Sequence, residues 1–338
     1  MITDKIEDFY NYILNYKLYL LIFFIIIFIF NYSNIDKFKL DASADTLILE
    51  NDEDYKFFKK ISNIFPSKDF LVLAYKSKNE IIDSKYIENI SKLKIELQKI
   101  EGIDSTFSII DAPILLSTDV SLSEFDFDNI ETLLSENINY KDALNELKNS
   151  PVFSEQIINI EGNISSIIAY LSEDESFNDI ISKRDKLKDE YALDKSNNFI
   201  KKKLKIINLE YEKNKETYNQ KRHILILDVR QVIKNLNLDE DIFLGGISMI
   251  ADDSLEFVKK DIVNFGLGVL IFITIILLLL FRNIKWVILP LTTTSFSVIS
   301  IICLLGLIGW KVTVISSNFI SLMFILTISM NIHIIVRY

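Results

Sequence analysis

A row of polar side chains in the last apolar stretch, residues 312–336, is the part of this sequence whose spacing best suits chemistry. Positions 318, 321, 325, 329, 333 and 337 share one helical face, and all but Ile325 are polar. Polar groups at membrane depth are costly unless they face other helices or a wet cavity. Because a histidine titrates near neutral pH, the candidates for a proton relay or gate are His333, Asn331, Ser329 and Arg337.

These residues also fit a simpler interpretation, as small polar groups at a seam between two helices. Residues 286–308 carry a comparable stripe, whose spacing allows it to face the first one. The candidate seam residues are Asn318, Ser321, Thr327, Thr293, Ser297 and Ser300. For His333 the alternative is an interfacial anchor, and Arg337 at the boundary suits a snorkelling anchor.

Enzymatic chemistry is not indicated elsewhere in the chain. The sequence has two histidines, His223 and His333, and one cysteine, Cys303, and it has no nucleophile–histidine–acid set, glycine-rich phosphate loop or metal cluster. We interpret the acidic pair Asp252-Asp253 as a helix N-cap. We therefore expect no catalytic residue, no cofactor and no metal, and a net charge of -10 argues against a nucleic-acid partner.

Four apolar segments are expected to position these residues as membrane helices. Residues 262–281, 286–308 and 312–336 each have about the 20 residues needed to cross the hydrocarbon layer. Residues 18–33 are shorter, so a signal peptide is the alternative. Flanking tyrosines, the snorkelling Lys17 and the lack of a small-x-small cleavage site favour an uncleaved first span.

Between the first two spans, residues 34–260 predict a water-soluble α+β domain. Residues 69–75 and 103–110 read as strands around an amphipathic helix at 86–101, which makes a βαβ unit. Further strands are predicted at 164–171 and 241–244. Residues 176–236 form a long charged helical region, interpreted as a hairpin turning at 195–198, or alternatively as one helix lying on the sheet.

The charge between the spans predicts the orientation. Arg282 and Lys285 lie in the short connection after residue 281, and such basic loops stay in the cytoplasm. Residues 1–17 are then cytoplasmic, and residues 34–260 lie outside.

This order of one span, a large external domain and a rapid series of spans resembles the first half of an RND-superfamily exporter, in its MMPL/Patched-like branch. The stretches that carry the resemblance are Phe281-Arg282 through Pro290-Leu291, Ile332-His333 with Arg337-Tyr338, Ala143-Leu144 through Ser150-Pro151 followed by Glu161-Gly162-Asn163, and Gly246 followed by Asp252-Asp253 and Asp261. The resemblance implies a four-helix membrane bundle and an external domain of ferredoxin-like, porter-type βαβ units with a long helical hairpin.

The resemblance also implies a function. Members export hydrophobic or lipid-like substrates across the bacterial inner membrane, with the large domain in the periplasm, and use the proton gradient. Implied partners are membrane lipid, the substrate, a remaining half of the transporter beyond this apparently truncated chain, and a periplasmic protein. The family's fourth span usually carries an aspartate one turn before the histidine; here that position is Met330, and residues 312–336 contain no acid.

Two other classes remain open at this point. A MacB/FtsX-like permease subunit of an ABC transporter shares the arrangement of one span, an external domain and three spans, and it would transmit the motion of a separate ATPase. A non-transporting sensor or scaffold would use the external domain to bind a partner, and the missing aspartate suits it.

Overall fold

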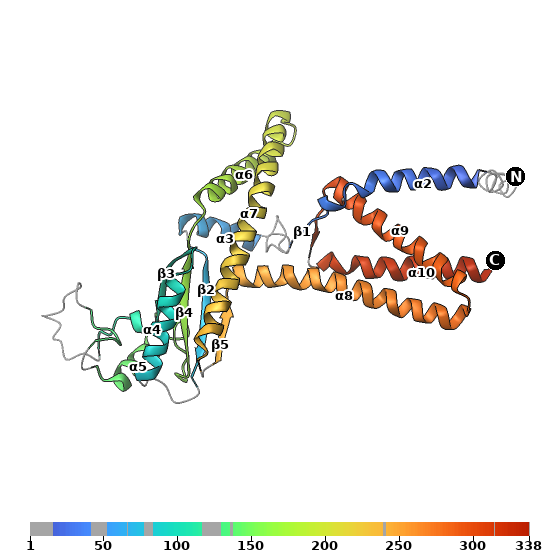
Figure 1. Ribbon diagram of the computed structural model, residues 1–338. Helices are drawn as coiled ribbons and strands as arrows, with labels where there is room; N and C mark the ends of the chain where they lie inside the picture. Colours follow the sequence, from blue (N-terminus) through green and yellow to red (C-terminus); the bar gives the residue numbers. More distant parts are fainter. Residues whose placement is uncertain are drawn as a thin grey trace. The chain divides into compact units, whose positions relative to one another are not determined.

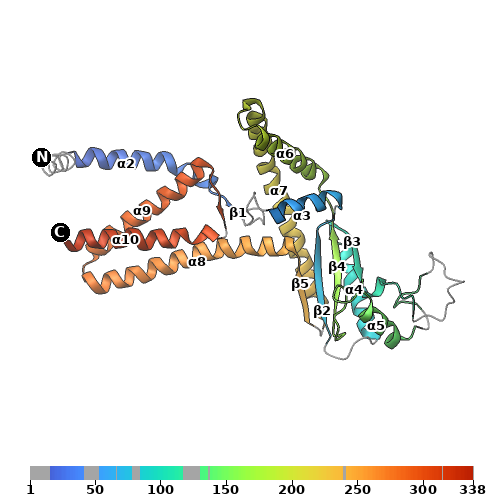
Figure 2. The ribbon, with the colours of Figure 1, turned by 180° about the vertical axis from the view of Figure 1, so that it is seen from behind.

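The computed structural model describes residues 16–41, 53–65, 67–77, 84–116, 130–135, 138–238, 241–313 and 315–337. The chain divides into two compact units. We call Glu53–Asp252 the sheet unit, and Met1–Asp52 together with Asp253–Tyr338 the helical unit. Each is described by itself below (Figures 1 and 2).

The sheet unit is built on four strands in the order β3-β4-β2-β5, and each neighbouring pair is antiparallel. The strands are β2 (Phe70–Lys76), β3 (Ile103–Ser108), β4 (Ile164–Leu171) and β5 (Asp241–Gly245). Helix α4 (Ser84–Gln98) connects β2 to β3. Since β2 and β3 are both antiparallel to β4, they run in the same direction with β4 between them. The predicted βαβ unit is therefore present in a split form.

One face of this sheet forms the main core. Along β2, Leu71, Leu73 and Tyr75 are fully buried, as alternation in a strand requires. Helix α4 lies along the sheet (Figure 2) and buries Ile90 and Leu97 completely. Fully burying such side chains contributes about 1.5–3 kcal/mol each.

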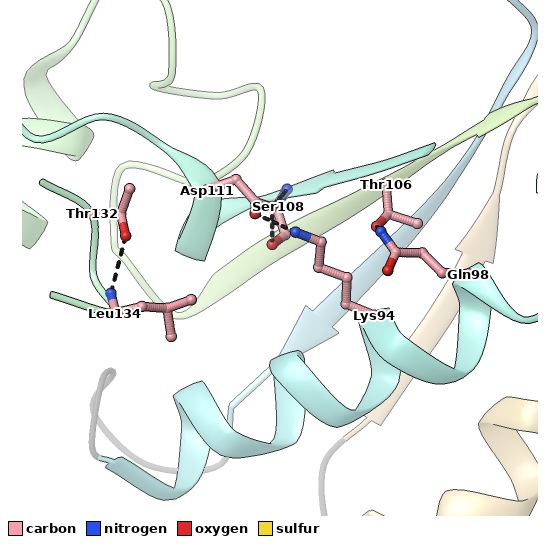
Figure 3. Close-up of polar contacts among 7 residues, drawn as sticks. All are labelled: Lys94, Gln98, Thr106, Ser108, Asp111, Thr132 and Leu134. Atoms are coloured by element: carbon pink, nitrogen blue, oxygen red, sulfur yellow. Dashed lines mark hydrogen bonds and ion pairs between the residues drawn. The ribbon is translucent and has the colours of Figure 1, made fainter. Parts of the chain in front are cut away.

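Polar contacts fix the C-terminal half of α4 to the end of β3 (Figure 3). Lys94 pairs with Asp111, and Gln98 Nε2 donates to Thr106 Oγ1 at 2.9 Å. Asp111 Oδ2 also accepts from the backbone N–H of Ser108 at 2.8 Å and from its hydroxyl at 2.9 Å. These contacts close a short 3-10 turn, Ile109–Asp111, and end the strand.

A helical hairpin leaves β4 and returns to β5. Helix α6 (Glu175–Leu193) begins at the cap Asp174, and α7 (Asn198–Leu236) begins at Asn197, whose side chain accepts from two backbone N–H groups. The turn lies where the sequence predicted it, between Leu193 and Asn198. The distal part of the hairpin holds its own small core, in which Phe177 stacks on Tyr211 and Tyr218.

The C-terminal half of α7 instead packs into the main core through Leu225, Ile226 and Val229. The region is therefore the predicted hairpin, and the alternative of a single helix is wrong, although the C-terminal half of α7 does pack into the main core.

Helix α8 (Ile247–Phe281) is 35 residues long and unbroken. It starts after Gly246, whose φ of +128° favours glycine, and Ile250 N–H donates to Gly246 O at 3.0 Å. Asp252 therefore lies inside the helix, and its interpretation as an N-cap is wrong. The polar residues before the apolar part are the first turns of the same helix.

The helical unit contains α2 (Lys17–Tyr32), most of α8, α9 (Ile284–Ile308) and α10 (Phe319–Arg337). Among the described residues, three helices are long and apolar enough to cross a membrane: Ile247–Phe281, Ile284–Ile308 and Ser316–Arg337. Helix α2 has 16 residues, so a fourth span at residues 18–33 stays a prediction. It contacts α9, where the rings of Phe28 and Phe296 stack 4.3 Å apart.

A small contact joins the end of α2 to the end of α9. Strands β1 (Leu40–Asp41) and β6 (Val312–Thr313) pair in parallel, and Val312 N–H donates to Lys39 O at 3.0 Å. Lys311 Nζ lies 3.4 Å from Asp41 Oδ2. We call this pairing the β1–β6 clasp.

Beneath the clasp, Gly306 of α9 admits the backbone that follows α2. A Cβ at position 306 would lie 2.4 Å from Asn34 O, which is closer than non-bonded atoms approach. We expect Gly306→Ala to lower the thermal stability of the detergent-purified protein, by about 1–3 kcal/mol in the free energy of unfolding.

Gly268→Ala is the matched control, because a Cβ there meets nothing within 4 Å and alanine favours the helix. Equal melting temperatures for the two variants, with Gly306→Ala unchanged from the wild type, would contradict the close packing.

Candidate functional site

Helix α9 has well-defined ends. Asn283 caps α9 by accepting from Lys285 N–H at 3.1 Å, and Gly309 ends it in the left-handed conformation with φ of +75°. Pro290 lies inside α9 and has no N–H to give to the preceding turn. The hydroxyl of Thr293 donates back to the same turn, at 3.0 Å to Leu289 O or 3.1 Å to Pro290 O.

One polar contact joins the two helices at this level. Asn331 Nδ2 of α10 donates to Thr293 Oγ1 at 2.9 Å and to Thr294 Oγ1 at 3.1 Å. Of the predicted seam residues, Thr293 makes this contact, but its partner Asn331 was predicted for the relay and lies outside the stripe of 318, 321, 325, 329, 333 and 337. We call Thr293, Thr294 and Asn331 the threonine–asparagine seam.

Thr294 was not among the predicted residues, although it is fully buried. The buried side of α9 runs through Val287, Thr294 and Val298, one residue away from the predicted stripe of 293, 297 and 300. The run of three threonines from 292 to 294 was the available signal, because the seven-residue spacing from Val287 selects Thr294.

The other predicted seam residues do not join the helices. Ser297 donates to Thr293 O of its own helix at 3.0 Å. Ser300, Ser321 and Thr327 are half-buried, and Asn318 is exposed in the short 3-10 helix η4 (Ile315–Asn318). Within the described chain, none of these side chains makes a hydrogen bond between α9 and α10.

The predicted relay residues divide between two sides of α10. Asn331 faces α9, whereas Ser329 and His333 line a hollow of about 410 Å³ between α8 and α10. Arg337 is exposed at the last residue of the helix. The structure therefore brings Ser329 and His333 together and separates them from Asn331.

The hollow beside His333 is almost wholly apolar. Its lining residues are Val269, Phe272, Ile273, Ile325, Ile328, Ser329, Ile332 and His333. The hydroxyl and the imidazole are the two polar groups in that wall. The apolar wall suits a hydrocarbon group.

A second polar cluster, in the sheet unit, was missed by the sequence reasoning. His223 Nδ1 of α7 lies 3.0 Å and 2.9 Å from the two carboxylate oxygens of Asp252 in α8. Beside it, Asp69 Oδ2 accepts from Ser248 Oγ at 3.2 Å and from Tyr218 OH at 3.5 Å. Burial raises the pKa of Tyr218, so its hydroxyl remains a donor.

These contacts tie the first turns of α8 to α7 and to the start of β2. His223 and Asp252 are 29 residues apart, and Ser248 and Asp69 are 179 apart. No local spacing in the sequence relates such residues.

The hydrogen bonds of Asn331 predict a measurable coupling between helices. We expect Asn331→Ala and Thr294→Val each to destabilise the protein, and the double variant to lose less than the sum. A coupling of about 0.6 kcal/mol is typical of such contacts in membranes. Thermal unfolding of the four proteins in one detergent measures it.

Ser329→Ala is the control, because Ser329 lies on the same helix but lines the hollow instead of the seam. Full additivity between Asn331→Ala and Thr294→Val would show that this contact is absent in the folded protein.

Comparison with known families finds a match to part of the chain. The model of the MMPL family matches residues 203–333, from near the start of α7 through β5, α8 and α9 to His333 in α10. The resemblance drawn from the sequence is confirmed over that range, and it is consistent with a transporter of the RND/MMPL type. The match does not favour the ABC-permease alternative. No curated protein matches the chain.

Proposed function

We propose that this chain, matched to the MMPL family over residues 203–333, is part of an RND-type exporter of hydrophobic or lipid-like substrates in the bacterial inner membrane. The observation that carries the proposal is that match, whose range contains two of the three membrane-length helices and most of the third. The apolar hollow between α8 and α10 supports a substrate with hydrocarbon character. Transport paths of such exporters are formed by two repeats, so a second half is a proposed partner.

The strand order of the sheet unit supports a porter role for the domain. Strands β2 and β3 form one split βαβ crossover around β4, and β4 and β5 form a second around β2. Two interleaved crossovers in one antiparallel sheet are the ferredoxin-like arrangement. In our proposal this domain lies in the periplasm, passes substrate and contacts a periplasmic partner.

The β1–β6 clasp supports the proposed topology. It pairs the segment after α2 with the segment between α9 and α10. If α8 and α9 each cross the bilayer once, the chain enters α8 on the same side as the clasp. Both connections to the sheet unit then lie on one side, which is the outer side if Arg282 and Lys285 are cytoplasmic.

Proton coupling is proposed to depend on His333. Met330 is exposed at the position where the family usually has an aspartate, and the wall of the hollow contains one titratable side chain, His333. An ionisable side chain inside a membrane costs free energy, so a histidine at this depth is expected to have a function. We propose that it exchanges protons as substrate moves, with Ser329 beside it.

The topology is tested by cysteine labelling in intact cells. In a Cys303→Ser background, Ser196→Cys in the turn between α6 and α7 should react with a membrane-impermeant maleimide added outside. Asn283→Cys in the connection between α8 and α9 should react only after permeabilisation. Both positions are exposed, so the reverse pattern would refute the proposed orientation.

The proton role is tested by His333→Ala in the complete transporter. We expect export of a lipophilic reporter to fall by about tenfold or more while membrane insertion stays normal, because an essential proton carrier has no substitute in this wall. Met330→Ala is the control, because Met330 lies one turn away on α10 and is also exposed, and this variant should export normally. Unchanged export by His333→Ala would reject the relay.

A further inference from the structure

Helix α3 (Glu53–Ile64), drawn in blue in Figure 1, carries large apolar side chains that are exposed in this fold. Its large side chains recur at one-, three- and four-residue steps, which places them on one side of a helix. The exposed fractions are Phe57 66%, Phe58 65%, Ile61 38%, Ile64 57% and Phe65 70%. Helices of a soluble domain normally bury such a stripe.

A helix of similar length in the same unit shows the contrast. Helix α5 (Tyr140–Asn149) buries Ala143 and Leu147 completely in the main core. Helix α5 thus covers the core of the sheet unit, whereas the large apolar side chains of α3 remain exposed. An exposed cluster of three phenylalanines and two isoleucines marks an interaction surface.

The charge of α3 indicates what covers this surface. Residues 55–65 hold three lysines and no acidic residue, although the chain as a whole has a net charge of -10. The two acidic residues, Glu53 and Asp54, are confined to the first turn, where they complement the helix dipole. Phenylalanine on one side and lysine around it is the composition of helices that lie in a membrane interface.

The chain also limits how far α3 can lie from the membrane. Asp41 belongs to the β1–β6 clasp, at the ends of apolar helices α2 and α9. The chain from Asp41 to Glu53 has twelve peptide steps, which extend to at most about 40 Å. If the helices cross a bilayer, the start of α3 is thus held within reach of its surface.

We propose that α3 lies in the headgroup layer of the membrane, with the phenylalanine face in the acyl boundary and the lysines toward lipid phosphates. The partner is the lipid surface itself. Contact of α3 with the membrane does not depend on transport and requires only that the apolar helices insert.

The test uses the full chain with Cys303→Ser, reconstituted in nanodiscs of phosphatidylcholine and phosphatidylglycerol. A bimane fluorophore is attached at Phe58→Cys, on the apolar face, or at Lys59→Cys, which the helical period places on the other side. We expect iodide quenching to be about threefold weaker at position 58, where a nitroxide carried on the lipid should quench strongly. Phe65→Cys provides a second site on the apolar face.

Each result decides the proposal. Strong lipid-nitroxide quenching at 58 and 65, with position 59 open to iodide, supports it. Equal iodide quenching at all three positions overturns it, because the face is then in water. Protection from iodide without lipid-nitroxide quenching also overturns it, because protein then covers the face. Monodisperse elution and protease resistance of α9 and α10 show separately that the helical unit is inserted.

Discussion

Backbone pairing in the β1–β6 clasp is the constraint on which the organisation of the helical unit depends. Two strands of two residues each bring together points of the chain that are 270 residues apart, at Asp41 and Lys311. The ion pair is partly buried, and the cost of removing its charges from water offsets part of their attraction, so its net contribution is modest. The clasp matters for geometry, because it holds the end of α2 and the end of α9 at one level. The whole sheet unit lies in the one long stretch of chain between these two helices.

Polar groups inside the apolar helices obey a second constraint, which is that each donor needs an acceptor. Asn331 has two N–H donors on one nitrogen, and two threonine hydroxyls accept from it. Those hydroxyls can donate in turn to carbonyls of α9, as Thr293 does. The amide nitrogen of Asn331 thus has acceptors for both of its donors, which suits a structural role, whereas Ser329 and His333 line an apolar hollow.

Local and regional features of this fold could be predicted from the sequence. Runs of apolar residues located the helices of the helical unit, because hydrocarbon thickness sets their length. The turn at 195–198 was placed at a break in the charged helical region, and strands were predicted from apolar runs of strand length. The family resemblance followed from the order of such elements, and the match over residues 203–333 confirms it there.

Features set by long-range contacts could not be predicted in this way. The insertion of β4 between β2 and β3 depends on pairing across the whole domain. Asp252 was assigned to a helix start because its neighbours in sequence offered no partner, whereas His223 comes from another helix. At the seam, a shift of one residue turns a helical face by about 100°, so Thr294 joins Thr293 in the contact although the predicted stripe passed through Thr293 alone.

The unbroken length of α8 has a mechanical consequence. At about 1.5 Å per residue, its 35 residues measure about 52 Å, against about 30 Å of hydrocarbon. About fifteen of these residues therefore exceed the length that a span requires, and at the start of the helix Ser248 and Asp252 contact Asp69 and His223 of the sheet unit. Because its backbone hydrogen bonds run without a break, α8 cannot lengthen or shorten over these 35 residues unless some of those bonds are lost.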